Sequence, residues 1–284
     1  MCGLFGMIGP GIARVDYKII DELMLVSSLR GEDGTGVVSG SSHGKHPRST
    51  LYKIPGDPFY WRTMLVSKAK IESALYDVNN NWVIGHVRKP TSGSIDQKAT
   101  QPFTHANVMG CHNGGIRGDI EGFASDSAKL YAYLNHFKGD IKKTLDELGV
   151  TAFDAYALVW FDVNTRKVNF LRNGKRKLYV AFNKERSVMY WASEFQMLKL
   201  VLDRNDIDYE LLYLLEDTLY SVDPSKISSK KTTEEFSREI VKPVAFSKPT
   251  IIDENVIELP ANIDSNGSDI PWIQQTQDKT RIVN

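Results

Sequence analysis

The sequence predicts an α+β protein whose strands form antiparallel sheets. Three observations indicate this class. Short apolar runs bounded by glycine or proline recur along the chain, as strands do. A few longer segments repeat apolar residues every three or four positions, as helices do. Of the 284 residues, 42% are hydrophobic and 25% are charged, which is typical of a globular protein.

The first half of the chain contains one helix among several strands. Residues 16–29 place three apolar side chains on one face, which predicts an amphipathic helix. These side chains are Ile19, Leu23 and Val26. The strands expected here are short or continuously apolar and cover residues 3–9, 35–40, 50–54, 82–88 and 107–112.

The second half begins with a helix after Ser125, which is a suitable N-cap. The apolar residues at helical spacing are Leu130, Tyr131, Leu134 and Phe137. Four strands follow, expected at residues 155–162, 168–172, 178–182 and 188–192. A further helix is predicted to bury Phe195, Leu198 and Leu202.

The composition changes beyond about Asp223. The remaining segment is polar and is broken by proline, glycine and serine, with only scattered apolar residues. We therefore expect one domain over residues 2–223 and a C-terminal tail over residues 224–284, extended or partly disordered.

The charge balance argues against a polyanionic partner. Lysine plus arginine and aspartate plus glutamate each number 35, so the formal net charge is zero. Neither nucleic acid nor a membrane is expected as a partner, whereas a small charged substrate in a local pocket is compatible with this balance. The chain has two cysteines and neither a signal peptide nor an apolar run of membrane-spanning length, so we expect a cytoplasmic location.

The chain opens Met-Cys-Gly, and a small residue in second place allows removal of the initiator methionine. Cys2 would then carry a thiol and a free α-amine on one carbon. With pKa values of about 8.5 for the thiol and about 7.7–8.0 for the amine, one residue supplies a nucleophile and its general base. The alternative is a small residue buried in the first strand.

The segment Cys111-His-Asn-Gly-Gly also has two interpretations. Asn113 and Gly114 form a common turn pair. Their side-chain amide and backbone N–H are equally a pair of donors suited to an oxyanion in acyl transfer. No second ligand pair accompanies Cys111 and His112 at suitable spacing, so no metal site is expected.

Two charged residues stand at the ends of predicted elements. Arg88 ends a buried strand, where it requires an anion such as a carboxylate or forms a structural salt bridge. Asp126 opens a helix, where a carboxylate commonly serves the helix dipole. The two side chains would equally suit the carboxylate and ammonium groups of one amino acid.

Together, and in this order, these segments resemble the class II, N-terminal nucleophile (Ntn), glutamine amidotransferase domain. The resemblance covers roughly residues 2–205. The matching segments are Cys2 to Gly6, Arg30 to Gly36, Gly85 to Gly93, Pro102-Phe103, His112 to Gly114, Ser125 to Ser127, Asp154 to Val159 and Tyr190 to Glu194. The resemblance implies the Ntn-hydrolase αββα sandwich, in which two packed antiparallel sheets are flanked by helices.

The resemblance also implies the catalytic groups. Cys2 would be the nucleophile with its own α-amine as base, and Asn113 with the Gly114 N–H would form the oxyanion hole. The side-chain amide of L-glutamine would be hydrolysed to glutamate and ammonia through a γ-glutamyl thioester on Cys2.

The substrate-binding and supporting residues follow from the same resemblance. Arg88 would hold the α-carboxylate of L-glutamine and Asp126 its α-ammonium, and Thr91 would help to fix it. Arg30 and His86 would support the site. No cofactor is implied.

The sequence departs from the family in two respects. Lys89 and Ser92 stand where the family often has a bulky residue and a histidine, so closure over glutamine is expected to differ. The roughly sixty residues after Asp223 are too few and too polar for an ammonia-using domain. The sequence therefore predicts a stand-alone glutaminase that passes ammonia to a separate synthetase or transferase subunit, or releases it.

Two other functions stay open at this point. An N-terminal cysteine amidase acting on a different amide would also begin with cysteine, although such enzymes lack the His-Asn-Gly and Gly-His-x-Arg segments. A non-catalytic binding module on the same fold is the other alternative, and the presence of every catalytic position argues against it.

Overall fold

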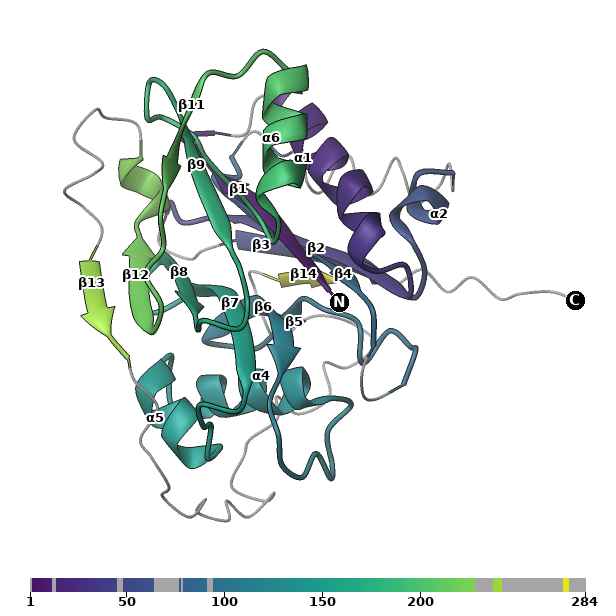
Figure 1. Cartoon of the computed structure of the whole chain (residues 1–284), viewed down its shortest axis with the longest axis vertical. Helices are drawn as coiled ribbons and strands as arrows, with labels where there is room; N and C mark the ends of the chain where they lie inside the picture. Colours follow the sequence, from purple (N-terminus) through teal and green to yellow (C-terminus); the bar gives the residue numbers. More distant parts are fainter. Residues whose placement is uncertain are drawn as a thin grey trace, which may run out of the picture.

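The computed structural model describes residues 2–11, 14–44, 48–63, 77, 79–90, 94–227, 237–241 and 273–275. Two β-sheets lie face to face, and helices cover the outer face of each sheet (Figure 1). The predicted class, two antiparallel sheets flanked by helices, is confirmed.

Within the described ranges the larger sheet has eight strands, in the order β11-β9-β10-β1-β4-β2-β3-β14. They are β1 (Gly3–Ile8), β2 (Gly34–Ser41), β3 (Arg48–Ile54), β4 (Trp82–Arg88), β9 (Tyr179–Asn183), β10 (Met189–Ala192), β11 (Tyr209–Leu212) and β14 (Ile273–Gln275). Only the β14–β3 pair is parallel among these strands. The central strand β1 pairs with β4 and β10. Cys2 directly precedes β1, so it lies at the end of the strand in the middle of this sheet.

The smaller sheet has six strands in the described part of the chain, all antiparallel, in the order β13-β12-β8-β7-β6-β5. They are β5 (Phe103–Thr104), β6 (Val108–Gly115), β7 (Ala155–Asp162), β8 (Lys167–Arg172), β12 (Thr218–Val222) and β13 (Ser237–Ile240). β13 lies beyond Asp223, and like β14 it adds an extended segment to the edge of a sheet.

The helices divide between the two outer faces. On the larger sheet lie α1 (Arg14–Ser27) and α6 (Phe195–Arg204), and α4 (Asp126–His136) and α5 (Ile141–Glu147) lie on the smaller one. The short elements are α2 (Pro58–Thr63) and the 3₁₀ turns η1 (Ser28–Arg30) and η2 (Pro224–Lys226). Among the described helices, none is both long enough and apolar enough to cross a bilayer.

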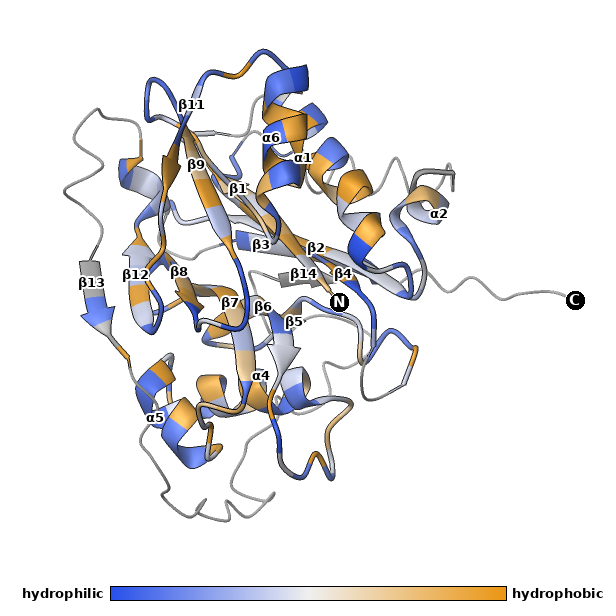
Figure 2. Cartoon of the chain, viewed as in Figure 1, coloured by the Kyte–Doolittle hydropathy of each residue, from blue (hydrophilic) through white to orange (hydrophobic). Residues whose placement is uncertain are grey.

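Strand alternation builds three apolar layers. In β1, Leu4 and Ile8 face the layer between the sheets, whereas Phe5 and Met7 face α1 and α6. The layer between the sheets is joined by aromatic contacts, including Trp82 stacked on Phe161 with ring centroids 4.5 Å apart. Figure 2 shows the same division, with apolar residues along the strands and on the inward sides of the helices.

Most sequence predictions agree with the structure. The strands predicted over 82–88 and 155–162 are observed with those bounds, and the Ser125 side chain caps α4 by accepting a hydrogen bond from the Ala128 N–H at 3.1 Å. The turn interpretation of Asn113-Gly114 is wrong, because both residues lie inside β6 and pair with β7. Phe195 is half-buried rather than enclosed.

Candidate active site

The site lies where the layer between the sheets changes from apolar to polar. On β4, Trp82 and Ile84 belong to this layer, and the alternation of the strand places His86 and Arg88 on the same face. On β6, Met109 and Cys111 belong to it, and Asn113 follows on the same face. The buried histidine, arginine and asparagine therefore meet at one end of the sandwich.

Cys2 stands at this end, immediately before β1. Its thiol donates to the Lys89 carbonyl at 3.5 Å and receives the Lys89 N–H at 3.4 Å. The Arg30 Nε donates to the Cys2 carbonyl at 2.7 Å, and the Arg30 guanidinium also pairs with Glu194. The backbone of Cys2 is thus held by β1 and by Arg30, while its sulfur contacts the segment after β4.

The backbone at Gly31 packs closely against the backbone of Arg88 and Lys89, the segment that the Cys2 sulfur contacts. Gly31 follows η1, and a Cβ added there would lie 2.5 Å from the Arg88 carbonyl carbon and 2.7 Å from the Lys89 nitrogen. The Asp33 N–H donates to the Arg88 carbonyl at 3.0 Å. Only glycine at position 31 allows the segment after Arg30 to pack against Arg88 and Lys89.

Burial shifts the thiol pKa of both cysteines in the same direction. Burial raises the pKa of the Cys2 thiol, and the Lys89 N–H and the Arg88 charge oppose this rise. Burial raises the pKa of Cys111 much further, and that residue is wholly enclosed in the layer between the sheets. Cys2 is therefore the cysteine that solvent reaches, with a donor beside its sulfur.

A network of hydrogen bonds connects Gln101, the β6 segment around His112, and the first turn of α4. The Gln101 side chain receives the His112 N–H at 2.6 Å and donates to the His112 carbonyl at 2.9 Å. The His112 ring nitrogen Nδ1 lies 2.9 Å from the Ser127 hydroxyl at the start of α4. One carboxylate oxygen of Asp126 receives the Ile116 N–H at 2.9 Å, and the other receives the Ser127 N–H at 2.9 Å. The residues around Gly114 are thus tied to the first turn of α4.

Asn113 is held from the larger sheet. Its Nδ2 donates to the Ser193 hydroxyl at 3.3 Å, and that hydroxyl accepts the Leu4 N–H at 2.8 Å. Ser193 follows β10, and its own N–H donates to the Leu4 carbonyl at 2.9 Å. Ser193 therefore links the asparagine to the strand that follows Cys2.

A small pocket joins these parts, with a volume of about 20 Å³. Cys2, Arg88, Gly114 and Asp126 all line it, together with Lys89, Pro90, Gln101, His112, Ser125 and Ser127. Asn113, Arg30 and His86 are not among the lining residues, and Thr91 lies outside the described residues. The structure therefore brings four of the predicted site residues to one cavity.

His86 is fully buried on β4, two positions before Arg88. Burial, with the nearby His112 and Arg88 charges, lowers the pKa of His86 to about 3. Neither ring nitrogen has a hydrogen-bond partner among the described residues. At neutral pH His86 is an uncharged part of the layer and has no access to the pocket.

Sequence reasoning missed three groups that hold the site. Gln101 and Ser193 make their contacts across 11 and 80 positions, and Glu194 reaches Arg30 across 164 positions. The signal available for Gln101 was its place directly before Pro102-Phe103. In the described part of the chain, no group of three or more acidic, histidine or cysteine side chains is placed to hold a metal ion.

Comparison with known proteins points to one kind of domain, although no protein-family model matches the chain. Amidophosphoribosyltransferase 3 of Arabidopsis thaliana is 33% identical over 120 residues, covering 40% of this chain and 20% of that protein. Amidophosphoribosyltransferase of Pasteurella multocida is 32% identical over 124 residues, covering 43% of this chain and 22% of that protein. The aligned segment therefore spans about a fifth of the length of these relatives.

Two solved structures extend the likeness to most of the fold. Glutamine phosphoribosylpyrophosphate amidotransferase of B. subtilis superposes with a TM-score of 0.57 at 19% identity, covering 85% of this chain and 49% of that one. A structure described as the allosteric regulatory enzyme of purine biosynthesis gives a TM-score of 0.58 at 20% identity, with the same coverage. The chain is thus homologous over about 40% of its length to amidophosphoribosyltransferases, and it has the fold of their class II, Ntn amidotransferase domain.

Proposed function

We propose that this protein is a glutamine amidotransferase or glutaminase, which hydrolyses the side-chain amide of L-glutamine to glutamate and ammonia. The observation that carries this proposal is the shared pocket of Cys2, Arg88, Gly114 and Asp126. These four residues come from separate elements, and each supplies a group that hydrolysis of an amino-acid amide requires.

Two opposite charges suit the α-substituents of glutamine. Arg88 offers a planar fork to the α-carboxylate, and Asp126 offers carboxylate oxygens to the α-ammonium. The Asp126 oxygens already accept two backbone N–H groups. A carboxylate has about four acceptor sites, so these bonds orient it and leave sites for the ammonium group. Thr91 would contribute a further substrate contact.

The first half of the reaction forms a thioester. Removal of Met1 leaves Cys2 with a free α-amine, which takes the thiol proton as the sulfur attacks the amide carbon. The oxyanion is stabilised by the Asn113 amide and the Gly114 N–H. The carbon–nitrogen bond then breaks, and the α-ammonium returns its proton to the leaving ammonia.

The second half restores the enzyme. A water molecule gives its proton to the α-amine and attacks the γ-glutamyl thioester, the carbon–sulfur bond breaks, and the Cys2 thiol is regenerated with glutamate as product. Arg30 acts as a positioning residue, since it holds the Cys2 carbonyl at 2.7 Å. We propose that a separate synthetase or transferase subunit accepts the ammonia.

Entry of glutamine requires movement of the pocket wall. A volume of about 20 Å³ is close to that of one water-sized probe and far below that of an amino acid. Lys89 and Pro90 form the wall next to the Cys2 sulfur, and they follow directly on β4. We expect this segment to move away from Cys2 when glutamine binds.

The test combines intact mass, ammonia release and covalent labelling. The purified chain should lack Met1 and release ammonia from glutamine, and a glutamine analogue bearing a diazoketone should attach to Cys2. Cys2→Ala should abolish both ammonia release and labelling, whereas Cys111→Ala should retain labelling. Full activity of Cys2→Ala, or of a chain that retains Met1, would contradict the mechanism.

The same assay separates the alternatives. A mature chain that binds glutamine without releasing ammonia would support a binding module. Ammonia release from other amides but not from glutamine would support an amidase of different specificity.

A further inference from the structure

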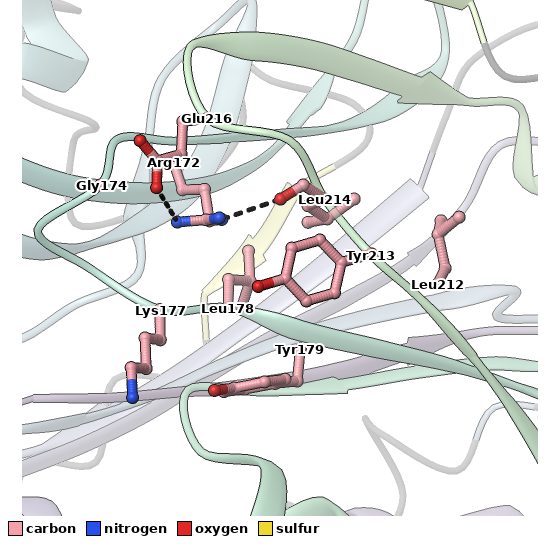
Figure 3. A pocket seen from close by; sticks show the side chains of 9 residues that line it. All are labelled: Arg172, Gly174, Lys177, Leu178, Tyr179, Leu212, Tyr213, Leu214 and Glu216. Atoms are coloured by element: carbon pink, nitrogen blue, oxygen red, sulfur yellow. Dashed lines mark hydrogen bonds and ion pairs between the residues drawn. The ribbon is translucent and has the colours of Figure 1, made fainter.

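A second and larger pocket lies at the same end of the sandwich and shares no lining residue with the Cys2 pocket. It has a volume of about 140 Å³ and is enclosed by the segment from Arg172 to Tyr179 and the segment from Leu212 to Glu216 (Figure 3). These segments meet because β11 pairs with β9, aligning Leu212 with Val180. We refer to it as the Arg172 pocket.

The Arg172 guanidinium supplies a buried positive charge. The residue is 8% exposed, and its Nε and Nη1 donate to backbone carbonyls, including that of Leu214 at 3.0 Å. Glu216 lies 3.8 Å from Nη1, which is beyond hydrogen-bond length. Nη2 has no hydrogen-bond partner in the described part of the chain. The group is therefore rigidly placed and keeps a free donor.

A second cation stands at the same pocket. Figure 3 shows the Lys177 ammonium and the Tyr179 hydroxyl extending to the same side. Among the described residues, Lys177 forms neither a hydrogen bond nor an ion pair. Arg172 and Lys177 are the two cations among the lining residues and Glu216 is the single carboxylate, which leaves one surplus positive charge. This surplus suits a monoanion better than a dianion.

The remaining walls are apolar and aromatic. Leu178 is buried and Tyr213 is 76% exposed, and Figure 3 shows the Tyr213 ring lying beside Leu178. A dry cavity of about 150 Å³ is known to hold a benzene ring, so the volume of this pocket admits one six-membered ring. Tyr213 offers a flat surface to such a ring at small entropic cost.

We propose that the Arg172 pocket binds a small aromatic carboxylate, with the ring against Leu178 and Tyr213 and the carboxylate on Arg172, while Lys177 adds a second positive charge at the edge of the pocket. A ligand of this size is expected to bind with a Kd in the millimolar range or below. The site stands on its own residues and does not depend on the reaction proposed at Cys2.

Benzoate is the probe, and benzamide is its uncharged counterpart of nearly equal shape. In the full chain labelled with ¹⁵N, benzoate should shift the amide resonances of residues 172–179 and 212–216 saturably, and benzamide should not. Lys177→Glu should raise the Kd for benzoate several-fold, because a positive charge at the pocket is replaced by a negative one that repels the carboxylate. Tyr213→Ala should also weaken binding.

Both variants change exposed side chains, so folding is preserved in the test. Lys142→Glu, an equal charge change on an exposed residue of α5, is the control and should leave the Kd unchanged. Absence of saturable shifts in these segments, equal binding of benzamide, or an unchanged Kd in Lys177→Glu would each overturn the proposal. The readout does not involve catalysis, so failure here leaves the proposed glutaminase activity untouched.

Discussion

The Cys2 pocket and the Arg172 pocket lie at one end of the same sandwich but differ in how their polar groups are used. In the Cys2 pocket, the side chains of Gln101 and Asp126 hydrogen-bond to backbone groups and that of Ser127 to the His112 ring, and the volume is about 20 Å³. In the Arg172 pocket the volume is about 140 Å³, and neither the Nη2 group of Arg172 nor the Lys177 ammonium has a hydrogen-bond partner within the described residues.

The two pockets are close neighbours across the sheets. Asn113, Ala157 and Arg172 align in successive strands of the smaller sheet, so the backbones of Asn113 and Arg172 are about 10 Å apart at two strand spacings. In the larger sheet, Ala192 of β10 is aligned with Tyr179 of β9. The next residue on one strand, Ser193, bonds to Asn113, and the preceding residue on the other, Leu178, lines the Arg172 pocket. One end of this fold thus combines a small, closely hydrogen-bonded pocket, where we propose the reaction, with a larger pocket, where we propose ligand binding.

The largest expected effect concerns the proposed reaction site. Asn113→Ala should lower kcat for glutamine hydrolysis by roughly 10²–10³, because one donor to the oxyanion is lost. Steady-state ammonia release measures this, with the benzoate Kd recorded in parallel. A normal kcat would show that Asn113 contributes no stabilisation of the oxyanion, and a changed benzoate Kd would show that the pockets are coupled.

A second prediction tests whether the wall of the Cys2 pocket is held by Gln101. Gln101→Met keeps the shape but leaves the buried His112 N–H and carbonyl without their partners. The free energy of unfolding should fall by roughly 2–3 kcal/mol, as measured by urea denaturation. Gln97→Met removes one exposed bond to the Lys53 carbonyl and is the matched control, expected to change stability by less than about 0.5 kcal/mol. Equal losses in both variants would contradict the rigid wall.

A third prediction concerns the substrate clamp. Arg88→Lys keeps the charge but loses the planar fork, so KM for glutamine should rise by roughly tenfold with a smaller change in kcat. Arg204→Lys, in which the replaced side chain is 71% exposed on α6, is the control. A fall in kcat with unchanged KM would assign Arg88 to the transition state rather than to binding.

The smallest expected effect is a pH dependence of stability. The pKa of His86 is lowered to about 3, so in acid the unfolded chain takes up a proton that the folded chain excludes. The stabilisation is complete above the unfolded pKa of about 6.5 and is lost as pH falls below it. For this one group the free energy of unfolding should drop by about 0.7 kcal/mol between pH 7 and pH 6. Urea denaturation of the wild type and of His86→Gln at both values measures it, and parallel profiles would contradict the assignment.

The sequence alone predicted those helices, strands and caps that are determined by residues close together along the chain. The β4 and β7 strands, the cap at Ser125 and the helical face of α1 follow from periodicity and from local hydrogen bonding. The order of the motifs also identified Cys2, Arg88 and Asp126, which the structure brings to one pocket. Each element signal and each single motif lies within a few positions along the chain, and only the order of the motifs spans residues 2–205.

Only the tertiary structure shows how segments that are far apart in the sequence contact one another around the two pockets. Asn-Gly is a turn signal by itself, yet the two residues lie inside β6 because pairing with β7 and packing between the sheets outweigh local preference. Ser193 reaches Asn113, and Leu212 to Glu216 reach Arg172, only through the register of β10 with β1 and of β11 with β9. The pattern of residues sets which face of a strand is apolar, but the register of distant strands is set by packing of the whole core, so the second pocket has no signature in the sequence.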